Sequence, residues 1–123
     1  MKFLTALVLA LPLSSFAANY AACDLYKFTY DSADNLIDSK RISNTWDRLA
    51  GNGDILLEDR VEDVSYSVTF SLKGQIFGSL RTGNDSFEIK SWSDINETLR
   101  ISVRDRDNKG QNTVYTLSCE LDS

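Results

Sequence analysis

Three stretches of the chain alternate apolar and polar residues with a period of two. In residues 65–72 one face is apolar and the other carries only hydroxyl groups: Tyr66, Val68, Phe70 and Leu72 against Ser65, Ser67, Thr69 and Ser71. Residues 98–104 and 113–121 repeat the pattern, with the apolar faces Leu99, Ile101, Val103 and Tyr115, Leu117, Cys119, Leu121. This period is typical of a strand with one face in a hydrophobic core. The three stretches are therefore predicted to be half-buried β-strands.

Turn-forming residues separate these and other strand-length stretches at intervals of about 8–12 residues. They cluster at 51–54, 73–74, 83–85 and 108–110. The predicted strands number seven or eight and cover roughly 23–30, 36–42, 55–60, 64–72, 76–82, 86–92, 98–105 and 113–121. Many short strands with short connections predict an all-β fold, either an antiparallel sandwich or a small closed barrel. The short connections also favour an up-and-down meander.

The stretch 44–62 has no clear period and leaves two interpretations open. Asn44 is a residue type that caps helices, and a short helical turn from it through Ala50 would end at Gly51. Asp54 would open a second short helix in the same way. The alternative is extended structure, of which the strand predicted over 55–60 is part.

The first seventeen residues have the layout of a secretory signal peptide. Lys2 supplies the positive charge, residues 3–13 are almost wholly apolar, and the small residues Ser15 and Ala17 form a cleavage site. The apolar run falls well short of the ~20 residues that a membrane-spanning helix needs. We therefore expect cleavage after Ala17, a single β domain over 18–123, and a secreted or periplasmic location. No later stretch predicts a transmembrane helix.

Cys23 and Cys119 are the two cysteines of the chain, so only one pairing is available. In an exported protein they are expected to form a disulfide that joins the N-terminal and C-terminal strands. They are not arranged as C-x-x-C, which argues against a redox role. Tyr20, Ala21 and Ala22 also resemble the end of a lipoprotein signal, in which Cys23 would be acylated. That alternative would leave Cys119 as a free thiol.

The chain contains no histidine, which excludes Ser-His-Asp and Cys-His catalysis and every zinc site that needs histidine. Four acids lie close together in the sequence, and we interpret them as solvated loop residues: Glu58, Asp59, Glu62 and Asp63. Residues 105–110 begin like an EF-hand calcium loop, but Lys109 and Thr116 occupy ligand positions. We interpret that segment as a polar hairpin turn. No catalytic residue, metal site or cofactor is predicted.

Charge narrows the choice of partners. The chain has 13 basic and 18 acidic residues and a net charge of −5, and removal of residues 1–17 takes away Lys2 but no acid. Nucleic acids and anionic membrane surfaces bind basic faces, so neither is expected as a partner.

Trp46 and Trp92 are the candidate binding residues. An exposed tryptophan at the rim of a sheet stacks on a sugar or anchors a protein partner, whereas a buried one closes the end of the core. By exclusion, the sequence predicts a small exported non-enzymatic protein, a binding or interaction module. It would act as an inhibitor or accessory protein for another secreted or envelope protein, and negative charge would speed its encounter with a basic partner. The alternative is a carbohydrate-binding module of the cell envelope, whose partner is a glycan.

Overall fold

The computed structural model describes residues 20–49, 54–71, 73–83, 87–106 and 111–122. These residues form eight antiparallel strands: β2 (Tyr20–Tyr30), β3 (Leu36–Arg48), β4 (Ile55–Val61), β5 (Val64–Ser71), β6 (Gln75–Thr82), β7 (Phe87–Asp94), β8 (Leu99–Arg106) and β9 (Asn112–Asp122). The predicted signal peptide, residues 1–17, lies outside the described residues. The predicted all-β fold is confirmed. Its strands begin and end close to the predicted ranges, except that β3 continues six residues beyond the predicted 36–42.

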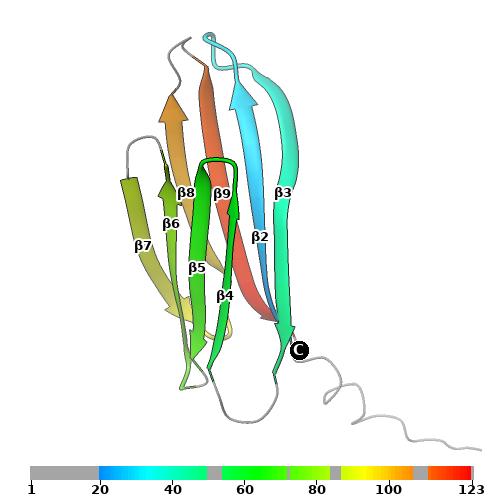
Figure 1. Ribbon diagram of the computed structural model, residues 1–123, viewed down its shortest axis with the longest axis vertical. Helices are drawn as coiled ribbons and strands as arrows, with labels where there is room; N and C mark the ends of the chain where they lie inside the picture. The colour runs from blue at the N-terminus through cyan, green and yellow to red at the C-terminus, as the bar shows by residue number, and fades with distance from the viewer. Residues whose placement is uncertain (1–19, 50–53, 72, 84–86, 107–110, 123) are drawn as a thin grey trace, which may run out of the picture.

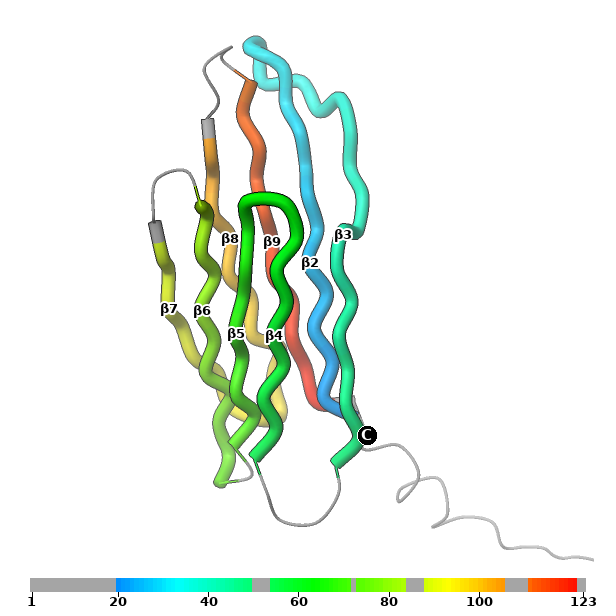
Figure 2. The backbone as a smooth tube through the Cα atoms, viewed as in Figure 1, coloured from blue at the N-terminus to red at the C-terminus, as the bar shows by residue number. Residues whose placement is uncertain are grey.

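The strands build two four-stranded sheets that pack face to face (Figure 1). One has the order β3-β2-β9-β8 and is called here the terminal sheet, because it holds the first and last strands. The other has the order β4-β5-β6-β7 and is called the central sheet. The tube in Figure 2 shows that the chain changes sheet between β3 and β4 and again between β7 and β8. Of the two predicted architectures, the sandwich is therefore the one observed, with the connections of an up-and-down meander.

The strand faces predicted from alternation are confirmed within the described residues, outside which Leu72 lies. The core between the sheets contains the apolar faces of β5, β8 and β9: Tyr66, Val68, Phe70, Leu99, Ile101, Val103, Tyr115, Leu117 and Cys119. On β2 the core face carries Ala21, Cys23 and Leu25, which are fully buried. The aromatic residues Tyr26 and Phe28 alternate with that face and lie on the outside of the terminal sheet, where their rings stack.

Gly78 allows β6 and β8 to approach across the core. A Cβ at this position would lie 2.6 Å from Cδ2 of Leu99 and 3.3 Å from Cγ2 of Val68. Contacts that short would force the side chains of Leu99 and Val68 to shift. The absence of a side chain at Gly78 therefore leaves room for Leu99 of β8 in the core.

The helical interpretation of residues 44–50 is wrong within the part that the structure describes. β3 continues to Arg48, and residues 44–48 pair with β2 as far as Tyr20. The side-chain amide of Asn44 donates to Oδ1 of Asp24 across the two strands, at 2.7 Å, instead of capping a helix. Asp54 directly precedes β4 and opens no helix either. Over the described ranges, no helix is long and apolar enough to cross a membrane.

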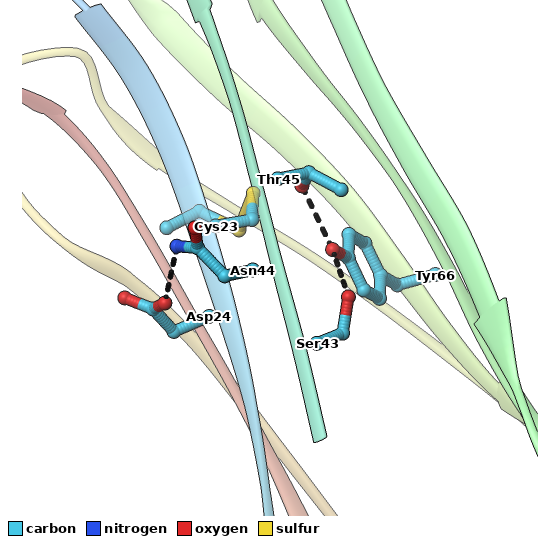
Figure 3. The surroundings of a disulfide bond; sticks show 7 residues. Cys23, Asp24, Ser43, Asn44, Thr45 and Tyr66 are labelled. Carbon is cyan, nitrogen blue, oxygen red and sulfur yellow. Dashed lines mark hydrogen bonds between the residues drawn. A yellow bond between two sulfur atoms is a disulfide. The ribbon is translucent and has the colours of Figure 1, made fainter. Parts of the chain in front are cut away.

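The predicted disulfide is present between the two inner strands of the terminal sheet. Cys23 and Cys119 lie directly opposite each other on β2 and β9, with their Cα atoms 4.1 Å apart, and both are fully buried (Figure 3). The bond therefore joins the first strand to the last, as expected. It also uses the sulfur that a lipoprotein would acylate, so this structure and an acylated Cys23 exclude each other.

Replacing both cysteines with alanine (C23A/C119A) is expected to lower the free energy of unfolding by about 2–5 kcal/mol. The bond joins residues that are 96 positions apart, so its loss frees almost the whole unfolded chain. Urea denaturation followed by tryptophan fluorescence measures the change, and wild-type protein under reducing conditions is the control. An unchanged denaturation midpoint in both samples would contradict this role of the bond.

Candidate functional site

Trp92 belongs to an apolar row that crosses the outer face of the central sheet. The register places Leu56, Thr69, Phe77 and Trp92 side by side on β4, β5, β6 and β7. Leu56 is 54% exposed, Phe77 46% and Trp92 62%. The outer face of an antiparallel sandwich usually carries polar residues. The apolar row, defined here as Leu56, Phe77 and Trp92, is therefore a candidate contact surface rather than part of the core.

A shallow trough adjoins the apolar row because β5 and β6 carry small side chains there. Its floor is formed by Ser65, Ser67 and Ser79, and we call it the serine trough. The central hollow has a volume of about 400 Å³ and contains all three serines. A second hollow of about 250 Å³ shares Ser67 and Ser79 and reaches Phe77, and a third of about 150 Å³ shares Ser65 and reaches Gly83. The three together follow the direction of the strands.

Two arginines stand on either side of Ser65 at the far end of the trough. Arg60 on β4 and Arg81 on β6 both pair with Ser65 in the register, and all three line the same hollows. Glu88 is the cross-strand neighbour of Arg81, but its carboxylate lies 4.0 Å from Nζ of Lys90 on its own strand. Among the described residues, neither arginine side chain has an ion-pair partner within 4.0 Å.

Trp46 lies on the outer face of the terminal sheet, so the two tryptophans do not form one site. It is 60% exposed, and its ring meets the ring of Tyr20 edge to face at 5.4 Å. The guanidinium of Arg48 lies over the same tyrosine ring, 5.5 Å from its centre. Tyr20, Ala22, Asn44 and Trp46 line an open hollow of about 330 Å³. Neither tryptophan closes the end of the core, so that interpretation is wrong for both.

Four side chains form a chain of hydrogen bonds between the sheets. Oγ of Ser43 lies 2.5 Å from Oδ2 of Asp59. It also lies 2.9 Å from the hydroxyl of Tyr66, which lies 2.7 Å from Oγ1 of Thr45 (Figure 3). An ionised carboxylate only accepts, so Ser43 donates to Asp59, Tyr66 donates to Ser43, and Thr45 donates to Tyr66. Ser43 and Tyr66 are buried. The chain of hydrogen bonds links β3 to β4 and β5, between which the described residues make no backbone hydrogen bonds, and this is a structural role.

The cluster of acids in the sequence is separated by the fold. Glu58 and Asp59 are part of β4 and point to opposite faces, whereas Glu62 and Asp63 form the turn to β5. The interpretation as loop residues is therefore wrong for the first two. No group of acidic or cysteine residues in the described ranges could hold a metal ion. Residues 107–110 of the EF-hand-like segment lie outside those ranges.

Glu62 makes an ion pair with Lys27, which lies on the core-facing side of β2. Its carboxylate lies 2.9 Å from Nζ of Lys27, close to where the β4–β5 turn meets the terminal sheet. The hydrogen bond from Lys27 lowers the pKa of Glu62, and the same bond raises the pKa of Lys27. Burial raises the pKa of the neighbouring Tyr115 hydroxyl. Glu62 also has a φ of 56°, in the left-handed region that few side chains favour.

Sequence reasoning found part of this surface and missed the rest. Trp92 was a candidate binding residue, but Leu56, Phe77 and the two arginines were not. The comparisons with protein-family models, with curated proteins and with solved structures gave no match for this chain. Function therefore has to be inferred from the surfaces described above.

Replacing Glu62 with glutamine (E62Q) is expected to lower the free energy of unfolding at neutral pH by about 0.2–1 kcal/mol, the usual value for an exposed ion pair. Because the folded-state pKa of Glu62 lies below 4.5, the pair contributes fully above pH 4.5 and is lost as the pH falls through that pKa. The raised pKa of Lys27 keeps the contribution complete up to pH 10.5. Urea denaturation across this range should show the two proteins converging in acid.

The matched control is E97Q, because Glu97 is an exposed turn residue without an ion pair in the described part of the chain. It should change stability little at any pH. A difference between wild type and E62Q that stays constant into acid would mean that the turn conformation, and not the charge, causes it.

Proposed function

We propose that this chain is a small exported, non-enzymatic binding module that engages another secreted or envelope protein through the outer face of its central sheet. The observation that carries the proposal is the exposed apolar row beside two arginines without ion-pair partners among the described residues. Tryptophan, phenylalanine and arginine are enriched at the centres of protein interfaces. An inhibitor or accessory protein would present such a face on a rigid scaffold.

The scaffold supports this role in two ways. β-strands hold every residue of the apolar row, so little conformational entropy would be lost when a partner binds. The buried disulfide is compatible with an oxidising compartment, and together with the predicted signal peptide it supports a secreted or periplasmic location. We propose no catalytic residue and no cofactor.

Replacing Trp92 with alanine (W92A) is expected to weaken binding of the partner at least tenfold, since truncating a central tryptophan typically costs about 2 kcal/mol or more. The protein would be immobilised, used to capture its partner from the envelope fraction of exporting cells, and then titrated against the purified partner. W46A is the matched control, because Trp46 has a similar exposure on the opposite face. Equal affinities for W92A and wild type would contradict the proposed binding face.

A second candidate function, glycan binding, is favoured by the hollow beside Trp46. Tyr20 meets the indole edge to face, Arg48 lies over the Tyr20 ring, and the indole stays exposed, which suits stacking against a sugar ring. Asp24 lies next to the hollow and accepts hydrogen bonds from Asn44 and, at 3.4 Å, from Arg41. Such a polar group beside an aromatic platform would orient sugar hydroxyls. This site lies on the other sheet and is independent of the apolar row.

Soluble cell-wall glycan fragments are expected to change the fluorescence of Trp46 in a saturable way if this second function is present. The variant W92F retains Trp46 as its single tryptophan and should give the full change. W46F retains only Trp92 and should give none. A change of equal size in both variants, or in neither, would argue against a sugar site at Trp46.

A further inference from the structure

Two rows of residues on the outer face of the central sheet carry charges in opposite order. The first row has its acid on the edge strand β4 and its base on the edge strand β7: Glu58, Ser67, Ser79 and Lys90. The second row has a base on β4 and an acid on β7: Arg60, Ser65, Arg81 and Glu88. Each edge strand therefore presents charges that complement those of the other edge strand.

The charges balance over this face as a whole. Its outward-facing strand residues include three bases and three acids: Arg60, Arg81, Lys90, Glu58, Glu88 and Asp94. Asp59 also lines the central hollow, but its carboxylate accepts a hydrogen bond from Ser43 of the other sheet. The charged residues of the adjoining turns, such as Asp63 and Lys73, lie beyond the ends of the rows.

The balance matters because the chain as a whole is acidic. It has 13 basic and 18 acidic residues, so two copies repel one another over most of their surfaces. The outer face of the central sheet, which is turned toward the viewer in Figure 1, carries none of that excess on its strands. Two copies can meet there without the general repulsion.

A second copy of this chain matches the charged rows if a twofold axis runs along the strands, between β5 and β6. That axis places β4 of one copy over β7 of the other, and each row over the same row of the second copy. Glu58 then faces Lys90 of the second copy, and Arg60 faces Glu88. Because such an interface is isologous, each contact occurs twice.

The same axis also places the apolar row over itself. Leu56 of each copy then faces Trp92 of the other, so the exposed apolar side chains are covered. Arg81 faces Ser65 of the second copy and has Glu88 beside it on its own sheet. Asp94 lies at the rim, where solvent and salt screen its charge.

An axis that runs across the strands gives a poorer match. If it passes through the row of Glu58 and Lys90, each of these charges faces its own equivalent. If it passes between the two charged rows, opposite charges meet, but the apolar row then lies over the turns of the second copy. Only the axis along the strands matches both the charges and the apolar row.

We infer that this chain forms a homodimer in solution through the outer face of its central sheet, with Glu58 against Lys90 and Arg60 against Glu88. Four strands about 4.8 Å apart and about 27 Å long give a face of roughly 500 Å², so two copies bury on the order of 1,000 Å². This area is near the lower limit for a specific interface, and we expect a dissociation constant in the micromolar range or weaker. The inference goes beyond the proposed function, because a partner that uses this face has to displace the second copy.

The test is sedimentation velocity of the exported, disulfide-bonded protein from micromolar to millimolar concentration. E58K and K90E are each expected to dimerise at least tenfold more weakly than wild type, because like charges then face each other at two places in the interface. E97K and R104E are the matched controls, since Glu97 lies in the β7–β8 turn and Arg104 lies on the other sheet. Both controls should dimerise like wild type.

Exchanging the two charges tests the contact itself. The double variant E58K/K90E should regain most of the wild-type affinity. An equimolar mixture of E58K and K90E should form a heterodimer, because opposite charges face each other again at both places. A wild type that stays monomeric at every concentration would overturn the inference, and so would an E58K variant that dimerises like wild type. A double variant no stronger than the single ones would also overturn it.

These measurements need no partner, so the dimer can fail while the proposed function stands. The reverse case is also recognisable. If the charge exchange restores the dimer but W92A binds the captured partner as tightly as wild type, the proposed function fails and the dimer remains.

Discussion

The pairing of the first described strand with the last is the constraint on which the sandwich depends. β2 and β9 run antiparallel over their whole length, and the buried disulfide holds their register at Cys23 and Cys119. Without that pairing the terminal sheet would divide into two hairpins, β2–β3 and β8–β9, each of which is marginal by itself. The contact closes nearly the whole chain into a loop and is entropically costly, which the covalent bond offsets.

The two sheets differ in how they are held together. The central sheet is a local meander of short hairpins, so its register needs no long-range contact. Where it meets β3, side chains replace backbone bonds: Tyr66 and Asp59 hydrogen-bond to residues of the terminal sheet. β5 therefore contributes to the core with one face and to the outer surface with the other. Its inner face holds Tyr66 in the core, and its outer face supplies Ser65 and Ser67 to the trough.

Strands were predicted best from the sequence where one face is buried and the other is exposed to solvent. Alternation identified β5, β8 and β9 because the core selects every second residue. It failed at the end of β3, an edge strand whose residues are mostly exposed, so that Asn44 resembled a helix cap although its partner is Asp24. Trp92 stood out because tryptophan is rare. Arg60 and Arg81 did not, because their position on either side of Ser65 depends on the register of three strands. That register was hard to predict, because the β4–β5 turn, Glu62-Asp63, lacks the usual glycine or asparagine.

The pairing of Tyr20 with Asp122 brings the first described residue next to the last residue of β9. Strands that follow one another in the chain are also neighbours in space, and the last strand lies beside the first. The packing therefore does not depend on which turn contains the chain ends. A circularly permuted chain, joined between residues 122 and 20 and opened at the Asp31–Asn35 turn, would keep every strand pairing, the disulfide and the whole outer face of the central sheet.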